Sequence, residues 1–248
     1  MDDAFGELRS LMNMDEVYRE DRARLWGLLD AQSTHDPEAF ASRWLPYLEG
    51  FPRHMGVYMT EVLGLEELEQ VASRVPVARF KLTLAYSDYD AARAAELAAS
   101  PWAANVGHLN LNRNAIGDAG ARALAESPHL RHVSELHLGH NGVGPDGAIA
   151  WAESENLSPV FKLYIADNQL GDEGAIALAR SRHLDTMSIL KMSDNGIGPV
   201  GAAALANAPG LSGLSDLGLS NNPIGREGER ALASSPYLSE YIRGRYGT

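Results

Sequence analysis

The sequence of 248 residues is 45% hydrophobic, carries a formal net charge of −12 at pH 7 and contains no cysteine. Its apolar fraction is sufficient for a continuous core, and the lack of cysteine excludes disulfides, cysteine-ligated zinc and thiol nucleophiles. Because the acidic charge is spread along the chain, it disfavours nucleic acid and anionic membranes as partners.

The first 50 residues have the pattern of amphipathic helices. Apolar residues such as Leu8, Leu11 and Leu25 recur at helical spacing between charged ones, and Asp36 followed by Pro37 is typical of a helix start. We therefore expect residues 1–50 to form a helical N-terminal cap over the open end of a solenoid, with a separate binding module as the alternative.

The beginning of the chain also bears on location. The phrase MDDAFGEL has neither the basic region nor the apolar run of a signal peptide, and no stretch has the length of a transmembrane span. Together with the absence of cysteine, this predicts a cytoplasmic protein.

Two imperfect copies of a repeating pattern come next. One begins at Met55 and Val57, and a second begins at Leu82 and Leu84, with Ser87 at a position that is Asn in later copies. Both are followed by helix-like sequence, so we expect two degenerate repeats, from residues 55 and 82.

The pattern is clear from Leu109 onwards, where one phrase returns five times at an interval of 27 residues. An unbroken interval of this length is typical of a solenoid whose units bury their faces against one another. The phrase reads LNLNRNAIGDAG, LHLGHNGVGPDG, LYIADNQLGDEG, LKMSDNGIGPVG and LGLSNNPIGREG, starting at Leu109, Leu136, Leu163, Leu190 and Leu217.

Each copy predicts one strand followed by a polar turn. The leucine and the apolar residue two places later alternate with exposed positions, as in a half-buried strand of a parallel sheet. A side-chain amide both donates and accepts, so a stacked column of Asn can satisfy backbone groups where each strand leaves the sheet. The predicted Asn ladder consists of Asn114, Asn141, Asn168, Asn195 and Asn222.

Each copy then predicts a helix. Pro145 follows Gly144 and Pro199 follows Gly198, which suits a glycine N-cap with proline at the first helical position. A second glycine, such as Gly174, lies within each helix, and we expect this column to let the helices lie close on the sheet.

The pattern LxLxxNxIGxxGAxALA at this interval resembles the bacterial-type, ribonuclease-inhibitor-like class of leucine-rich repeats. The resemblance implies an α/β fold: a right-handed solenoid with a parallel β-sheet on its concave face and helices on its convex face. Proteins of this kind include inhibitors, activators of small GTPases and the sensing arms of immune receptors. Many are rich in cysteine, and this chain differs in having none.

The expected domain division follows from the repeats. The cap spans residues 1–50 and the solenoid spans 51–248, with repeats from 55, 82, 109, 136, 163, 190 and 217 and a C-terminal cap over 239–248. Gly244 and Tyr246 fall where a further strand would begin. We therefore interpret YIRGRYGT as the remnant of a last strand that pairs with the sheet edge.

Three motifs suggest chemistry but have simpler interpretations. The phrase GHNGVGPDG resembles a phosphate loop, yet no lysine follows and its later glycines belong to repeat columns. His129 and His132 fall on a return loop whereas His137 and His140 fall on or after a strand, so we predict no metal site. No nucleophile and base occur in a recognisable catalytic motif, so we predict no enzyme and no cofactor.

The variable positions of the repeat lie on the concave face. Alternation turns the residue between the two apolar strand positions outward, and aromatic residues beside charges are typical of protein-binding surfaces. We predict a protein partner there and favour a monomer. The alternatives are the convex helical face or the N-terminal cap as the binding surface, regulation of a small GTPase or other enzyme as the function and, less favoured, a metal protein or hydrolase. The predicted site consists of Tyr58, Tyr86, Asn110, Arg113, His137, His140, Tyr164, Asp167, Lys191, Asp194 and Arg245.

Overall fold

The computed structural model describes residues 58–62, 79–156, 159–183 and 185–247. The chain divides into two compact units: unit 1 comprises Met1–Thr83 and Asn105–His108, and unit 2 comprises Leu84–Ala104 and Leu109–Thr248. The predicted N-terminal cap, residues 1–50, lies outside the described residues, as do Met55 and Val57 of the first degenerate repeat.

Unit 1 contains a parallel pair of strands, β1 (Tyr58–Val62) and β2 (Arg79–Thr83). Val62 lies opposite Leu82 and Tyr58 lies opposite Arg79. Our alignment of the first degenerate copy, in which Met55 takes the position of Leu82, is therefore wrong. The register is irregular between Tyr58 and Glu61.

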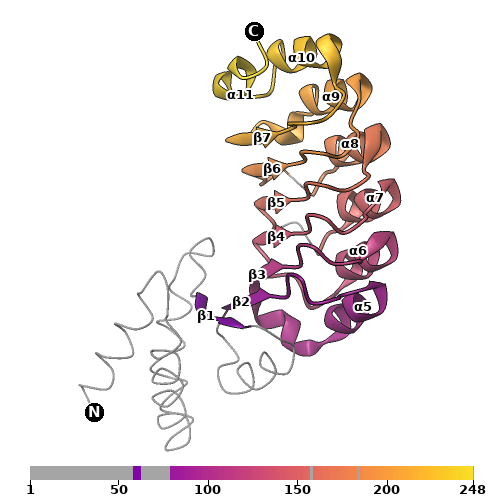
Figure 1. The fold of residues 1–248 in the computed structure, drawn as a ribbon. Helices are drawn as coiled ribbons and strands as arrows, with labels where there is room; N and C mark the ends of the chain where they lie inside the picture. Colours follow the sequence, from indigo (N-terminus) through magenta and orange to yellow (C-terminus); the bar gives the residue numbers. More distant parts are fainter. Residues whose placement is uncertain (1–57, 63–78, 157–158, 184, 248) are drawn as a thin grey trace, which may run out of the picture. The chain divides into compact units, whose positions relative to one another are not determined.

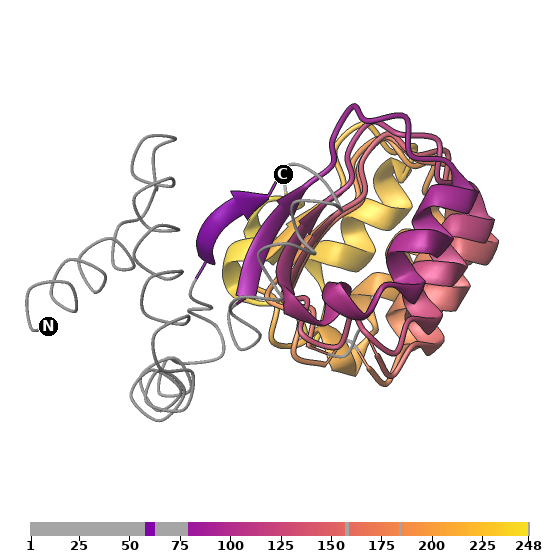
Figure 2. The same ribbon diagram turned by 90° about the horizontal axis from the view of Figure 1, so that it is seen from below.

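Unit 2 alternates strands and helices in an α/β solenoid. Its strands pair in parallel and in chain order, with Leu136 opposite Leu163, Leu163 opposite Leu190 and Leu190 opposite Leu217. In Figures 1 and 2 these strands line one side of unit 2 and helices α5 to α10 line the other. The strands are β4 (Glu135–His137), β5 (Lys162–Tyr164), β6 (Ile189–Lys191) and β7 (Asp216–Gly218), while β3 (Val106–Asn110) begins in unit 1 and ends in unit 2.

The helices begin where the repeat predicts. The glycine N-caps at Gly144 and Gly198, each followed by proline, are confirmed. The helices are α5 (Ala91–Ala99), α6 (Gly117–Glu126), α7 (Pro145–Glu153), α8 (Gly171–Arg180), α9 (Pro199–Ala206), α10 (Gly225–Ala233) and α11 (Glu240–Gly244), with 3₁₀ turns η2 (Pro101–Asn105) and η3 (Pro209–Leu211).

The core of unit 2 lies between the sheet and the helices. Leu109, Leu190 and Leu217 are fully buried, and the residues on either side of each strand leucine are more exposed in β4, β5 and β6. Leu84 and Leu97 are buried as well, which supports a repeat from residue 82. The alternation expected for half-buried strands is therefore present in the structure.

The ladder asparagines bond the backbone of neighbouring repeats in two ways. Asn168 donates to the carbonyls of Leu138 and Ile165 and accepts from the N–H groups of Asn141 and Val143. Asn141 donates in the same manner, to Leu111 and Gly139, but its buried Oδ1 has no hydrogen-bond partner. Successive rungs of the ladder therefore differ in strength.

The backbone conformation at the helix starts also alternates from one repeat to the next. Gly117 and Gly171 open α6 and α8 with φ of +57° and +58°, whereas Gly144 and Gly198 are extended. The carboxylate of Asp118 accepts from the N–H groups of Gly144, at 2.7 Å, and Gly147, at 2.9 Å. Each extended glycine thus receives a cap from the preceding repeat, which a single-repeat pattern does not predict.

Asp172 repeats this contact one pair of repeats later. Its Oδ1 accepts from the N–H groups of Gly198, at 2.7 Å, and Gly201, at 2.8 Å. Arg226 occupies the same position in the last clear repeat. The alternation of carboxylate and proline therefore ends with α10.

The second glycine column lets each helix lie close to two neighbours. A Cβ atom added to Gly174 would lie 2.9 Å from Cβ of Leu170 and 3.1 Å from Cβ of Ala148, which belongs to the preceding helix α7. The column therefore allows each helix to lie close both to the buried apolar residue that precedes it, such as Leu170, and to the preceding helix. Our prediction named the sheet alone and did not include the contact between helices.

A column of serines links the ends of successive helices. The hydroxyls of Ser127 and Ser154 donate to the carbonyls of Ala98 and Ala125, both at 2.6 Å. Ser181 and Ser235 donate in the same way to Ala152 and Ala206, whereas the equivalent position after α9 is Ala208. One alanine thus interrupts the column.

The C-terminal segment forms a helix and no strand. Ser239 caps α11 through its side chain, which accepts from the N–H of Ile242, so our interpretation of YIRGRYGT as a strand remnant is wrong. Its contacts with β7 come from side chains: Arg245 reaches Asp216, and the Tyr246 hydroxyl donates to the carbonyl of Leu217. A serine N-cap at the start of this segment outweighs its spacing from the last repeat.

Candidate functional site

The face of the sheet opposite the helices, which we call the open face, contains a hollow with small residues in it. Ala85, Gly139 and Ala166 occupy three of four equivalent positions in successive repeats, and Asn112 occupies the position between Ala85 and Gly139. The hollow has a volume of about 370 Å³. Its lining, which we call the cup, is made of Ala85, Tyr86, Asn110, Asn112, Arg113, His137, Gly139, His140, Tyr164, Ala166 and Asp167.

A stacked pair of rings forms one wall of the cup. The rings of His137 and Tyr164 lie 4.2 Å apart between centroids, at an interplanar angle of 13°. They stack because the parallel register places His137 directly opposite Tyr164 on the next strand. Burial raises the pKa of the Tyr164 hydroxyl, and the nearby carboxylate of Glu135 raises it further.

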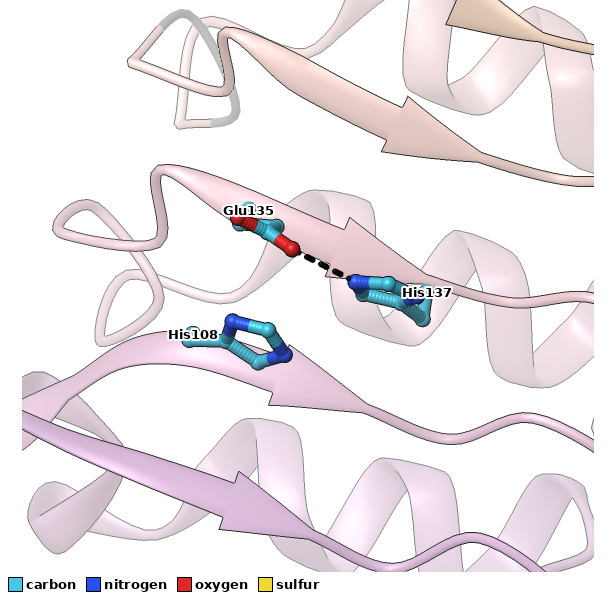
Figure 3. Close-up of side chains that lie close together, drawn as sticks. All are labelled: His108, Glu135 and His137. Carbon is cyan, nitrogen blue, oxygen red and sulfur yellow. Dashed lines mark hydrogen bonds and ion pairs between the residues drawn. The ribbon is translucent and has the colours of Figure 1, made fainter. Parts of the chain in front are cut away.

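Glu135 fixes the other side of the histidine ring. Figure 3 shows its carboxylate bonded to Nε2 of His137, at 2.8 Å, from the same strand β4. Lys162 on β5 also binds Glu135, at 3.1 Å. His137 is therefore held between a carboxylate and an aromatic ring.

The rim of the cup contains residues in an unusual backbone conformation. The residue before each ladder asparagine has a positive φ, including Arg113 (58°), His140 (55°) and Asp167 (56°). Tyr86 (57°), which precedes Ser87 at the equivalent position, has the same conformation. Asp and His tolerate this conformation better than most residues, whereas tyrosine and arginine do not favour it. The backbone conformation therefore does not explain why tyrosine and arginine occupy positions 86 and 113.

The rim residues contact one another across the repeats. The guanidinium of Arg113 lies 5.4 Å from the centroid of the Tyr86 ring, and the imidazole of His140 lies 3.0 Å from the carboxylate of Asp167. The Tyr86 side chain is 72% exposed. An exposed aromatic ring beside a cation is typical of a surface that binds another molecule.

The remaining predicted residues lie outside the cup. Lys191 crosses Gly218 and bonds to Asp216, which Arg245 also binds, at 2.8 Å. Asp194 accepts from the side chain of Asn221, at 3.2 Å. The structure thus brings seven predicted residues together in the cup and leaves Lys191, Asp194 and Arg245 elsewhere on unit 2. The side chain of Tyr58 lies outside the described residues.

Sequence reasoning missed several members of the cup. Ala85, Asn112, Gly139 and Ala166 belong to one column, and the small side chains at three of its four positions are the signal that predicts a hollow. Asn110 and Arg113 were each predicted from their own position in the repeat, without the neighbours that they have in the cup. Their grouping depends on the parallel register, which sequence alone gives only by extrapolation from the repeat.

The glycine-rich phrase GHNGVGPDG has a structural role. Gly142 has a φ of +66°, and the N–H groups of Gly144 and Gly147 already bond to the carboxylate of Asp118. These are the groups that would bind a phosphate at a helix start. An internal carboxylate occupies them instead.

The helical face also contains a hollow, between α7 and α8. Its volume is about 660 Å³, and apolar residues such as Ile149, Ile176 and Ala177 line it together with Glu153 and Arg180. It is larger than the cup, but its lining contains no tyrosine, tryptophan or phenylalanine. This face therefore offers fewer of the anchors that dominate protein interfaces.

Comparison with known families identifies the repeats. The family model described as Leucine Rich repeat matches residues 104–125, 129–150, 162–179 and 183–206. The chain contains leucine-rich repeats within residues 104–206. The matched segments include strands β4 to β6 and most of the residues of the cup. A search of curated proteins found no match.

Among the described helices, none combines the length and the apolar character that crossing a bilayer requires.

Proposed function

We propose that this protein is a non-enzymatic interaction module that binds a protein partner through the open face of unit 2. The observation that carries the proposal is the stacked pair His137 and Tyr164 at the wall of the cup. A rigid aromatic pair beside a hollow supplies contact area at little cost in side-chain entropy. The leucine-rich-repeat family is also generally non-enzymatic, which agrees with this function.

The finer assignments are proposals of the same kind. The repeats fit the ribonuclease-inhibitor-like class, because paired strands are related by residues 27 apart, such as Leu136 and Leu163. A cytoplasmic location is proposed from the lack of cysteine. Regulation of a small GTPase rests on family resemblance alone, and GTP turnover by candidate GTPases with and without the protein would test it.

The test of the binding proposal begins with affinity capture. The full-length protein is used to capture partners from its source organism, and each captured protein is then titrated by calorimetry against purified variants. Tyr164→Ala should weaken binding by about 2 kcal/mol or more, because it removes an aromatic anchor. Its fold should be retained, since Tyr164 is only partly buried.

The matched control is Tyr241→Ala, which removes a 68% exposed tyrosine from α11. It should leave the dissociation constant unchanged. If Tyr241→Ala weakens binding while Tyr164→Ala does not, the partner binds the C-terminal end and the proposal is wrong. If neither variant changes the affinity, variants of Ile176 in the hollow of the helical face are the next to measure.

A further inference from the structure

The cup presents hydrogen-bond donors from two fixed amide groups. Oδ1 of Asn110 accepts from the N–H of Asn112, at 3.1 Å, and Oδ1 of Asn112 accepts from the N–H of Gly139, at 2.7 Å. A backbone N–H can be matched only by the oxygen of a side-chain amide, so these bonds determine the orientation of both amides. No acceptor among the described residues binds either Nδ2 group, and both residues line the cup.

Arg113 adds a third donor and a positive charge. Its guanidinium lies over the ring of Tyr86, and within the described part of the chain no carboxylate forms an ion pair with it. The other cations of the open face differ, because Lys162 binds Glu135 and Lys191 binds Asp216. Arg113 is therefore the lining residue whose charge is available to a ligand.

The acidic member of the lining does not cancel this charge. Asp167 is the one carboxylate among the residues that line the cup, and its Oδ2 lies 3.0 Å from the imidazole of His140. Its interaction with that ring leaves the two amides and the guanidinium as the groups that distinguish ligands. A ligand with two acceptor oxygens and a negative charge satisfies all three.

We propose that the cup binds the carboxylate of a glutamate or aspartate side chain on the partner's surface. The carboxylate would accept from Asn110, Asn112 and Arg113, and the stacked rings of His137 and Tyr164 would contact its methylene groups. The volume of about 370 Å³ is at the small end of ligand pockets, which suits a single side chain. This inference rests on the proposed function and specifies the chemistry of the partner at that site.

The test uses the full-length protein and three small probes in NMR titrations. Acetyl-glutamate α-amide carries the side-chain carboxylate, acetyl-glutaminamide is its neutral isostere, and acetyl-alanine carries only a terminal carboxylate. Binding is followed by the side-chain amide signals of Asn110 and Asn112. We expect the glutamate probe to bind about fivefold or more tightly than the glutamine probe, because a charge-assisted bond to a guanidinium is lost in the isostere.

Two variants with the same change of charge locate the effect. Arg113→Gln should bring the glutamate and glutamine probes to equal affinity, while Lys191→Gln, on the same face but outside the cup, should preserve the preference. Tighter binding of acetyl-alanine than of the glutamate probe would assign the cup to a chain terminus and overturn the proposal. Equal binding of the charged and neutral probes to the wild-type protein would also overturn it.

The two proposals fail separately. If the glutamate probe is not preferred but Tyr164→Ala still weakens the captured partner, the open face is the interface and only the carboxylate is wrong. If the probe is preferred but Tyr164→Ala has no effect, the partner binds elsewhere and the cup serves a different acidic ligand.

Discussion

Asn168 makes its side-chain bonds in both directions, and this distinguishes it from the neighbouring rung Asn141. Both amides donate to two buried carbonyls, but only Asn168 also accepts from two backbone N–H groups. Asn168→Ala therefore leaves two more buried donors unpaired than Asn141→Ala does. Because an unsatisfied buried group costs about 1–3 kcal/mol, Asn168→Ala should be the more destabilising variant by at least about 1 kcal/mol in denaturant unfolding.

Asn141→Ala also removes an oxygen that is buried without a partner, which reduces its cost further. Equal unfolding midpoints for the two variants would show that the rungs are equivalent and that the alternation in the ladder has no energetic meaning.

The charge pair at Asp216 makes stability depend on pH. The hydrogen bond from Lys191 lowers the pKa of the Asp216 carboxyl, and Arg245 lowers it as well, against the effect of partial burial. A folded-state pKa below the ordinary value of 3.8 stabilises the protein wherever the carboxyl is ionised. This contribution is present above the ordinary value and is lost as the pH falls through the lower folded-state pKa.

We therefore expect the difference in unfolding free energy between wild type and Asp216→Asn to be constant from pH 7 to about pH 4, and to shrink at lower pH. Denaturant melts at a series of pH values measure it. Asp185→Asn, at an exposed aspartate that forms no ion pair among the described residues, is the control. A difference in unfolding free energy between wild type and Asp216→Asn that grows as the pH falls would contradict this prediction.

At the scale of the element, the helices α7 and α9 depend on a residue of another repeat for their N-caps. Asp172 bonds two N–H groups at the start of α9, and no side chain of α9 itself caps that helix. Asp172→Ala should therefore cost about 0.5–2 kcal/mol in denaturant unfolding, the usual loss for an N-cap. Glu173→Ala removes an exposed acidic residue one position later and should change the stability by less than about 0.5 kcal/mol. Equal losses of unfolding free energy in the two variants would show that the effect comes from negative charge in general and not from the N-cap hydrogen bonds of Asp172.

The elements were predictable to the extent that they recur in every repeat. The strand leucines, the ladder asparagines and the glycines at the helix starts each recur at a fixed position of the repeat, so the sequence alone predicts where they lie. The cap from Asp118 to the next helix recurs only every second repeat, and a search for one-repeat identity does not detect it. The serine column, from Ser127 to Ser235, does recur at the repeat interval, so it could have been predicted from the sequence. The helix α11 departs from the interval and is predicted better by its Ser239 cap.

The candidate site was predictable as a face but not as a cup. Alternation turns His137 and Tyr164 outward, whereas their stacking requires the parallel register between β4 and β5. The engagement of Lys191 by Asp216 depends on Gly218, whose missing side chain lets the lysine cross the neighbouring strand. The pair of Lys191 and Asp216 joins two repeats at unequal columns, which composition and spacing do not reveal.

At the scale of the whole molecule, the alternating caps make the effective building block two repeats long. Removing residues 163–189 would join the repeat from Leu136 directly to the repeat from Leu190, and Pro145 would then occupy the position from which Asp172 caps α9. The shortened protein should lose one N-cap in addition to one repeat interface. Pro145→Asp should restore the cap and raise the unfolding free energy of this deletion variant by about 1 kcal/mol.

The same substitution in the full-length protein should have the opposite sign. There Pro145 occupies the first turn of α7, and the next helix begins at Gly171, whose N–H already bonds to the carbonyl of Asn195. Pro145→Asp would remove a favourable first-turn proline and create no cap. Thermal and denaturant melts of the four proteins complete the cycle, and a destabilising effect of Pro145→Asp in both backgrounds would contradict the two-repeat block.

The break in the serine column at Ala208 bears on how the solenoid would respond to a pulling force. When a solenoid is pulled at its two ends, every interface between neighbouring repeats carries the same force. The interface with the fewest cross-links should therefore separate first. Hydroxyl bonds join the ends of α5 to α6, α6 to α7, α7 to α8 and α9 to α10, but alanine replaces the serine where α9 meets α8. The carboxylate of Asp172 nevertheless makes two hydrogen bonds across that same interface, to the N–H groups of Gly198 and Gly201, and these compensate for the missing hydroxyl. Mechanical rupture should therefore begin at an interface that has the serine bond but no carboxylate cap, such as α7–α8 or α9–α10, where proline occupies the position of Asp172.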